Sequence, residues 1–318
     1  MEKTLYRNLN GFLRCLFGEK VYKVGLYGGF TCPNRDGTLG RGGCTFCNPL
    51  SSRPRCYSPG MTIGEQLETG CSYIRDRHGA KLYMAYFQDY TTTWGDPNRL
   101  REIYRRALAH PGVVGLALCT RPDCLGDRVL DLLEEISEET FLWVEIGVQT
   151  ASERLLSAMN RCHTMKETVE AFRLLGHRGI HSSAHIILGY PGETPSDRLE
   201  TARFVSGSGA LGIKIQNLHV VKNTGLENAF VKGAFEPMSL DGYVEAVIRF
   251  LENIGPGVVV QRLTGEAPAE LTVSPGWSVN KMDVLNRIKS RMRSEKRWQS
   301  KALGYPVAAL EEPLSLPE

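Results

Sequence analysis

The feature that most constrains the fold is a regular alternation between short apolar segments and longer segments with helical spacing of apolar residues. Runs rich in β-branched or apolar residues, which favour strands, occur at 22–27, 82–87, 113–118, 141–148, 183–188, 213–221 and 257–263. Segments with apolar residues every three or four positions occur at 62–77, 98–109, 126–138, 152–159, 165–177, 195–206 and 239–253. This alternation predicts parallel strands joined by crossover helices.

Local signals support the predicted helix starts. "GDPNRL" and "TPSDRL" each place Asp or Ser beside Pro just before an apolar-periodic segment. Six or seven β/α units suit a complete or partial barrel better than a doubly wound sheet, although alternation alone does not separate the two. We therefore predict an α/β fold with a partial (β/α)6-type TIM barrel over residues 21–270. Residues 1–20 form an N-terminal extension, and residues 271–318 form a basic helical C-terminal extension.

A barrel requires its functional groups to lie where the strands end. Cys32 follows the first predicted strand, and Gln88 and Asp89 follow the second. The next three strands end at "TRPD" (120–123), at Glu145 and Gln149, and at "GYPGE" (189–193). Polar and glycine-rich segments thus gather on one rim, which indicates an active site there rather than a stabilising feature.

Three cysteines lie in the glycine-rich segment "TCPNRDGTLGRGGCTFCN", with the spacing C-x11-C-x2-C. A structural zinc site needs four protein ligands, and the nearby Cys56 and Cys71 fit no zinc module. A [4Fe–4S] cluster held by Cys32, Cys44 and Cys47 would leave one iron open to a ligand, and thiolates suit iron–sulfur chemistry. A zinc or merely structural knuckle is the alternative.

Composition limits the setting in which these thiols act. The chain is 42% hydrophobic and 23% charged, with a net charge of +3 and nine cysteines. No apolar run approaches the length that crosses a bilayer, and the charged N-terminus lacks a signal peptide. We therefore expect a cytoplasmic protein with reduced cysteines and no membrane partner.

The motifs together resemble one family. "LYGGFTCPNRDGTLGRGGCTFCN", "YFQDYTTTW", "TRPDCL", "EIGVQTASERLLSAMNR", "HIILGYPGET" and "QRLTGEAP" occur in the order seen in the radical S-adenosylmethionine (SAM) superfamily. They are most similar to its Elongator-type branch and to a bacterial family typified by YhcC and YtqA. The resemblance implies a [4Fe–4S] cluster that cleaves SAM to a 5′-deoxyadenosyl radical, in a barrel of the radical SAM kind. It also implies a flavodoxin- or ferredoxin-type reductant.

The resemblance further implies which residues contact SAM: Phe46, Gln88, Thr120, Glu145, Gln149, Arg161, His185 and Gly189. Gln88 stands where most relatives carry a Gly-Gly-Glu-type turn, and His185 stands where several carry an acidic ribose ligand. Simple packing roles remain open for Phe46 and His185, and a solvated charge remains open for Arg161. Cys119 and Cys124 flank "TRPD" and could take part in catalysis or be buried thiols.

The tail at 281–301 suggests a substrate. It carries eight Lys or Arg against two acids, and Met282, Leu285, Ile288 and Met292 recur at helical spacing. We expect the helix to dock by this apolar side and present Arg287, Lys289, Arg291, Arg293 and Arg297 to a phosphate backbone. The Elongator resemblance implies tRNA, with modification of the C5 side chain of a wobble uridine, for example carboxymethylaminomethyl to aminomethyl. The alternatives are a radical SAM enzyme acting on a small molecule or protein, and a non-catalytic Fe–S or zinc RNA-binding protein.

Overall fold

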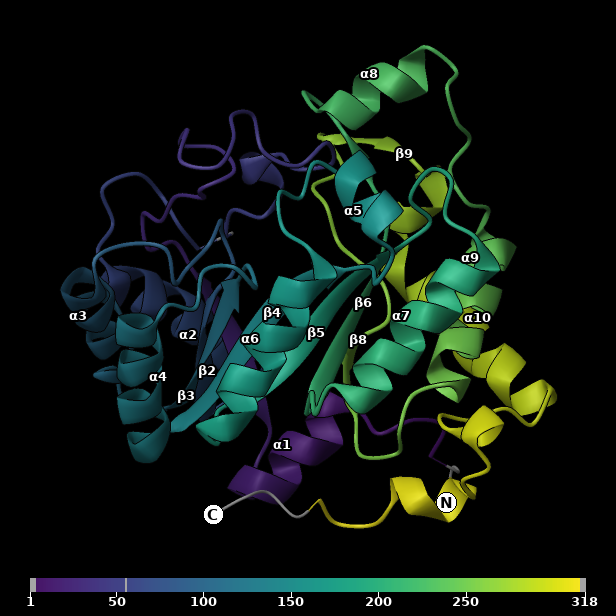
Figure 1. Ribbon diagram of the computed structural model, residues 1–318. Helices are drawn as coiled ribbons and strands as arrows, with labels where there is room; N and C mark the ends of the chain where they lie inside the picture. Colours follow the sequence, from purple (N-terminus) through teal and green to yellow (C-terminus); the bar gives the residue numbers. More distant parts are fainter. Residues whose placement is uncertain (1–3, 55, 315–318) are drawn as a thin grey trace.

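The computed structural model describes residues 4–54 and 56–314, and its centre is one curled sheet of parallel strands (Figure 1). The strand order is β1-β2-β3-β4-β5-β6-β8, so each strand pairs with the next one along the chain. The strands are β1 (Val21–Leu26), β2 (Leu82–Phe87), β3 (Val113–Thr120), β4 (Phe141–Gln149), β5 (His181–Leu188), β6 (Gly212–Asn217) and β8 (Val259–Arg262). No pairing joins β1 to β8 among these described strands, so the sheet is a partial barrel with an open seam, as the alternation predicted.

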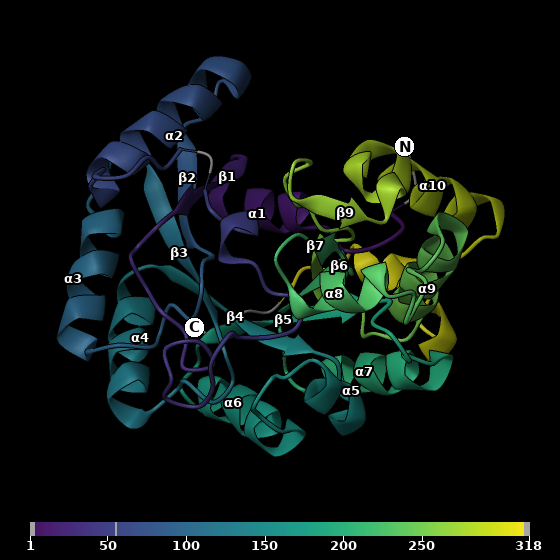
Figure 2. The ribbon, with the colours of Figure 1, turned by 90° about the horizontal axis from the view of Figure 1, so that it is seen from above.

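Helices cover the convex side of the sheet, where Figure 2 shows them as an arc seen from above. They are α2 (Ile63–His78), α3 (Pro97–Leu108), α4 (Asp127–Glu139), α6 (Met165–His177), α7 (Pro195–Gly207) and α9 (Leu240–Glu252), with the short α5 (Glu153–Ala158) at the upper rim. The two segments expected to start helices do so. Asp96 caps α3 and Thr194 caps α7, each just before a proline in the first turn.

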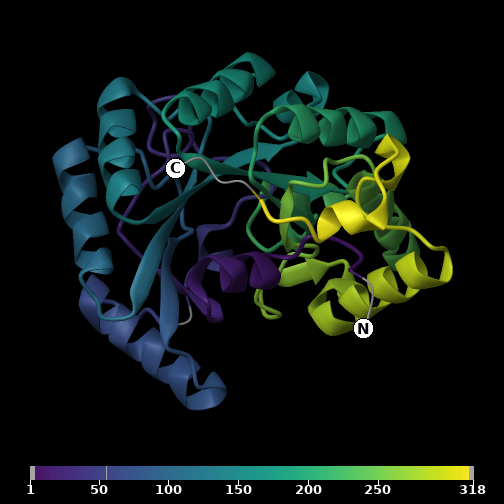
Figure 3. The same cartoon turned by 90° about the horizontal axis from the view of Figure 1, so that it is seen from below.

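The N-terminal extension contains a helix that the apolar pattern did not predict, α1 (Leu9–Phe17). It contacts both β1 and β8, and Figure 3 shows it in purple across the gap between the two ends of the strand arc. Phe12 and Leu13 of α1 pack inside the barrel against Trp143 and Met84. The lower interior is therefore filled with apolar side chains, which leaves the upper interior for polar ones.

The predicted strand at 213–221 is in fact two strands. β6 ends at Asn217, and β7 (Val220–Val221) pairs antiparallel with β9 (Thr272–Ser274) in a separate small sheet. At that point the Asn217 Oδ1 accepts hydrogen bonds from Thr264 Oγ1 and Gly265 N, both at 3.0 Å, which ties the end of β6 to the segment after β8. The connection after β7 forms α8 (Gly225–Val231), which was also not predicted.

The basic tail forms α10 (Lys281–Ser294), shorter than the predicted segment. Its buried residues are Val284, Ile288 and Met292, whereas Met282 is 62% exposed. The expectation that Met282 faces the core was wrong, because Val284 falls on the stripe shared by Ile288 and Met292 at intervals of four residues. Within the described part of the chain, no helix has the length and apolar character needed to cross a membrane.

Candidate active site

A cavity of about 230 Å³ opens at the upper rim, where the parallel strands end. The walls include Cys32, Cys44 and Cys47 from the loop after β1, together with residues from the ends of β3, β4 and β5. Because all strands of the sheet run in one direction, their carboxyl ends share this rim. The three thiols and the polar strand-end residues thus meet in one place.

The cysteine loop is shaped by backbone hydrogen bonds and anchored at its centre. The Arg35 and Asp36 amides donate to the Cys32 carbonyl, and the Cys47 amide donates to Cys44 O at 3.0 Å. Thr45 lies between the last two cysteines, and its amide donates to Met159 O while its carbonyl accepts from Leu226 N. The loop is therefore fixed to α5 and α8, although it contributes little apolar surface itself.

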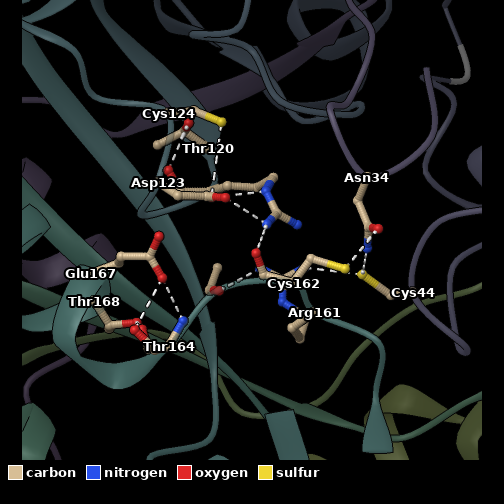
Figure 4. Close-up of polar contacts among 12 residues, drawn as sticks. Asn34, Cys44, Thr120, Asp123, Cys124, Arg161, Cys162, Thr164, Glu167 and Thr168 are labelled. Carbon is tan, nitrogen blue, oxygen red and sulfur yellow. Dashed lines mark hydrogen bonds and ion pairs between the residues drawn. The ribbon is translucent and has the colours of Figure 1, made fainter. Parts of the chain in front are cut away.

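Cys44 is buried and receives two hydrogen bonds on its sulfur. Arg161 Nη1 lies 3.2 Å and Asn34 Nδ2 lies 3.6 Å from Cys44 Sγ. Figure 4 shows Asn34 beside the sulfurs of Cys44 and Cys162, and Cys162 Sγ donates to Asn34 Oδ1 at 3.2 Å. Donors aimed at a cysteine sulfur are the partners that a metal-bound thiolate uses.

Cys32 and Cys47 are free thiols like Cys44, so each is available as a ligand. All nine cysteines are free thiols. Burial raises the pKa of the Cys47 thiol to about 11, with a further contribution from Cys44; a positively charged metal centre would reverse this by binding the thiolate. Among the described residues, no three His, Cys, Asp or Glu side chains surround one point as ligands of a single metal ion. A cubane cluster takes each thiolate on a separate iron, so its ligands need not converge on one point.

Several buried polar atoms around the cavity lack hydrogen-bond partners within the described structure: Thr91 Oγ1, Arg121 Nη1, Gln149 Oε1 and Arg161 Nε. Leaving such atoms unpaired costs free energy, so their concentration at one cavity indicates a polar ligand. They include donors and acceptors, which an amino acid carboxylate, an ammonium group and ribose hydroxyls could satisfy. The residues present therefore fit both halves of the implied cofactor pair, the cluster and SAM.

The end of β4 is built to bring Gln149 and Arg161 together. Gln149 has a left-handed backbone (φ +68°), and the pairing of β4 with β5 shifts register between Gly147 and Gln149. A Cβ at Gly147 would lie 3.0 Å from both Arg161 Nη2 and Gln149 Nε2. Because Gly147 has no side chain, Arg161 Nη2 reaches the Gly147 carbonyl at 2.7 Å.

Glu145 lines the cavity, but its carboxylate already has partners. Lys23 Nζ lies 2.7 Å from Oε1, Lys214 Nζ binds Oε2, and Cys119 Sγ donates to Oε2 at 3.1 Å. Burial alone would raise the pKa of this carboxyl, yet Lys214 and Lys23 hold it well below its usual range. Glu145 is thus an ionised carboxylate whose two oxygens already bind lysines, so it is not a free acceptor for SAM.

Of the remaining residues predicted to contact SAM, four line the cavity and one lies outside its lining. Phe46, Gln88, Thr120 and His185 all line it. The His185 ring binds Gln216, and burial, with a contribution from Lys214, lowers the pKa of His185 to about 3, so the ring is neutral. Gly189 is not among the lining residues: it turns the chain after β5 with φ +92°, and its amide donates to Glu193 Oε2 at 2.8 Å.

Sequence reasoning missed two lysines beneath this cavity, Lys23 and Lys214. Lys23 stands within the apolar run "VYKVGL" and Lys214 within "GIKIQN". A lysine inside a buried strand is rarely unpaired, so each was a signal of an acidic partner inside the barrel. Of the other cysteines near "TRPD", Cys119 lines the cavity and Cys124 is buried without lining it.

Three of the predicted phosphate-binding arginines of the basic tail have acidic partners. Arg287 pairs with Asp283 and Asp241, Arg291 with Glu245 and Glu295, and Arg297 with Glu252, Glu245 and Glu295. Lys289 and Arg293 instead line a groove between α10 and the edge of the sheet. The basic residues of the tail are therefore not one uniform surface.

Comparison with protein families finds two matches along the chain. A model described as the Radical SAM superfamily matches residues 32–205, and a model described as the Radical_SAM C-terminal domain matches residues 210–294. The boundary between them falls before β6, yet β6 and β8 continue the same sheet. The two matched regions therefore share one folded core.

Some relatives match nearly the whole chain, and a more distant one matches half of it. The uncharacterized protein YtqA of Bacillus subtilis is 43% identical over 296 residues, covering 93% of this chain and 92% of YtqA. Protein YhcC of Escherichia coli is 36% identical over 305 residues, covering 96% and 97%. A protein named tRNA uridine(34) acetyltransferase, from Methanocaldococcus jannaschii, is 27% identical over 168 residues, covering 50% of this chain and 30% of that protein.

Among solved structures, Elp3 of Methanocaldococcus infernus is similar with a TM-score of 0.68 at 16% sequence identity. The match covers 88% of this chain and 64% of Elp3. At this identity the likeness concerns the fold, and it agrees with the partial barrel described above.

Proposed function

The chain belongs to the radical SAM superfamily, and on that premise we propose that Cys32, Cys44 and Cys47 hold a [4Fe–4S] cluster beside a SAM site in the rim cavity. When bound, the cluster would supply the electron for reductive cleavage of SAM, and the 5′-deoxyadenosyl radical so formed would take a hydrogen atom from the substrate. The observation that carries the proposal is the meeting of three thiols with four unpartnered buried polar atoms around one cavity.

The residues around the cavity would bind and orient SAM. Gln149 Oε1 and Arg161 Nε are buried and unpartnered, and they lie on the same side as Cys44, to which Arg161 already donates. An arginine suits a carboxylate because its guanidinium offers several fixed donors. Arg161 therefore connects a cluster ligand with the position proposed for the SAM carboxylate.

The walls would also exclude water. Phe46 packs on an apolar cluster that includes Leu155, Met159 and Tyr190, and it closes one side of the cavity. A water-poor cavity strengthens the electrostatic contacts within it and limits side reactions of reactive intermediates.

For the substrate, we propose tRNA and, within it, the C5 side chain of a wobble uridine. Support comes from the relative named for acetylation of tRNA uridine 34, which shares the matched half of this chain. One such reaction would take a hydrogen atom from the CH2 beside the carboxylate of a carboxymethylaminomethyl group. Loss of one further electron to the flavodoxin- or ferredoxin-type partner and hydrolysis of the resulting C=N bond would release glyoxylate and leave aminomethyl. A flavodoxin- or ferredoxin-type protein would supply the electrons.

The test has two parts, because radical chemistry and substrate are separate questions. Anaerobically reconstituted protein with dithionite should bind about four irons per chain and release 5′-deoxyadenosine from SAM. Modified nucleosides in tRNA from wild-type and deletion strains should then differ at uridine 34. A protein that binds iron but releases no 5′-deoxyadenosine would be a binding module. Release of 5′-deoxyadenosine with identical nucleoside profiles would point to a small-molecule or protein substrate.

A further inference from the structure

The open seam of the barrel carries a groove of about 640 Å³ that the active-site cavity does not include. It runs between the edge strands, with Val21 of β1 on one side and Val260 of β8 on the other. α1 contributes Leu9 and Leu13 to its walls, the segment before α1 contributes residues 4–6, and α10 contributes one row of side chains. We call this feature the seam groove.

Side chains four residues apart form rows along α10, and three of its four rows differ in what they contact. One row, Val284, Ile288 and Met292, is buried against the core. A second row, Asp283, Arg287, Arg291 and Glu295, forms ion pairs within itself and with α9. The third row, Lys281, Leu285, Lys289 and Arg293, lines the seam groove. Residues four apart lie on one helix face, so the third row runs about 18 Å along the groove, at 1.5 Å per residue.

The groove is lined by cations without acids among its described residues. Its charged lining residues are Lys20, Arg262, Lys281, Lys289 and Arg293. Lys281 pairs with Glu266. In the part of the chain that the structure describes, Lys20, Arg262 and Lys289 have no carboxylate partner, although Lys20 Nζ lies 4.2 Å from the centre of the Tyr22 ring. A concave surface with several cations and no acid attracts phosphates strongly.

A thin polar layer separates the groove from the active-site side of the barrel. Gln261 lines the groove, and its side chain accepts from Lys23 Nζ at 2.9 Å and donates to Ser183 Oγ at 2.9 Å. Lys23 in turn pairs with Glu145, which lines the rim cavity. Gln261 and Lys23 thus connect a polymer bound in the seam groove with Glu145 of the rim cavity.

We propose that the seam groove binds the phosphodiester backbone of the RNA substrate through Lys20, Arg262 and Lys289. The proposal rests on the proposed tRNA substrate and adds the place where its backbone is held. It also moves the phosphate contacts away from Arg287, Arg291 and Arg297, because their charges are already compensated by carboxylates of α9 and α10. Backbone contacts position a nucleic acid without reading its sequence, so base recognition is left to the rim cavity.

The test compares two double variants that each remove two positive charges. One is Lys20→Gln with Lys289→Gln, in the groove, and the other is Arg287→Gln with Arg291→Gln, in the paired row. The probe is an unmodified tRNA transcript, and Kd is measured over a range of salt concentrations. Each lost phosphate contact reduces the log–log salt slope by about 0.7 for single strands or about 0.9 for duplex. The groove variant should therefore lose about 1.4 to 1.8 in slope, and the paired-row variant should keep the wild-type slope.

A rescue variant and a stability control distinguish loss of phosphate contacts from loss of folding. Lys20→Arg with Lys289→Arg should restore the slope, and equal unfolding midpoints would exclude a folding defect. If wild type binds tRNA but both Gln variants share its slope, or only the paired-row variant loses slope, the groove assignment is wrong and the tRNA proposal stands. If wild type binds tRNA without salt dependence, the groove assignment also falls. If wild type does not bind tRNA, the groove assignment and the tRNA proposal are both wrong. If polyglutamate at equal charge concentration displaces tRNA, the groove binds an acidic peptide instead.

Discussion

Arg161 Nη1 donates a hydrogen bond to Cys44 Sγ at 3.2 Å, although the two residues are 117 positions apart in the chain. The other terminal nitrogen, Nη2, donates to the Gly147 carbonyl at 2.7 Å. One buried side chain thus ties the cysteine loop after β1 to the end of β4. Arg161 thus contacts a proposed cluster ligand and also lines the cavity proposed for SAM.

The first prediction concerns the cluster potential. Arg161→Gln removes a positive charge and a donor beside Cys44, and both stabilise added negative charge on a cluster. We expect a more negative reduction potential, measured by redox titration with electron paramagnetic resonance, and SAM binding weaker by about tenfold or more, as for a lost charged hydrogen bond. Arg161→Lys should be intermediate. An unchanged potential in Arg161→Gln would mean that the contact with Cys44 has no electronic effect.

The second prediction concerns the cluster ligands. Removing any one of the three proposed ligands should release most of the iron on anaerobic reconstitution, because the cluster is then held by two thiolates only. The variants are Cys32→Ala, Cys44→Ala and Cys47→Ala. Cys162→Ser is a near-site control, since its sulfur contacts Asn34 and not the cavity. Cys56→Ala is a second control. Full iron content in Cys32→Ala, or its loss in Cys56→Ala, would refute the assignment.

The third prediction separates a structural from a ligand role for Glu145. Glu145→Gln leaves the buried Lys214 and the partly buried Lys23 without their carboxylate, and breaking a buried pair costs about 3–5 kcal/mol. The free energy of unfolding, measured by chemical denaturation without cofactors, should fall accordingly. Glu102→Gln is the contrast, because its pair with Arg106 is exposed and contributes less than about 1 kcal/mol. Weaker SAM binding with unchanged stability would instead restore the ligand role.

The fourth prediction is a pH dependence from Asp89. Burial raises the pKa of this carboxyl from 3.8 to about 6, against the lowering effect of Ser52 and Arg53. The folded state therefore holds the proton more tightly than the unfolded state, and the stability from this group is lost as pH rises from about 4 to about 6. This pKa difference corresponds to a loss of roughly 3 kcal/mol in the free energy of unfolding.

Asp89→Asn should remove this component, so the variant should be more stable than wild type at pH 7 and similar near pH 3.5. Urea denaturation of the cofactor-free protein at several pH values measures both. Equal stability of the two proteins at pH 7 would show that the carboxylate is satisfied when ionised.

The sequence by itself determined the order and type of the main elements. Apolar periodicity is a local property, so it located the seven strands of the sheet and the helices between them, most of them within one or two residues. It also indicated which residues share the rim, because carboxyl ends of parallel strands meet at one edge. This is why Cys32, Gln88, Thr120, Glu145 and Gln149 could be grouped from their strand-end positions, and they do line one cavity, whereas Asp89 and the turn at 189–193 do not.

Only the tertiary structure decided which charges meet. The sequence showed Glu145 on the rim and eight basic residues in the tail, but not that Lys23 and Lys214 hold Glu145. Nor could it show that α9 supplies carboxylates to Arg287 and Arg291 of α10 while Lys289, which lines the seam groove, has none among the described residues. The physical reason is that ion pairs and hydrogen bonds depend on distance in space. A local pattern states which face a side chain occupies, and only the packed fold states what lies opposite that face.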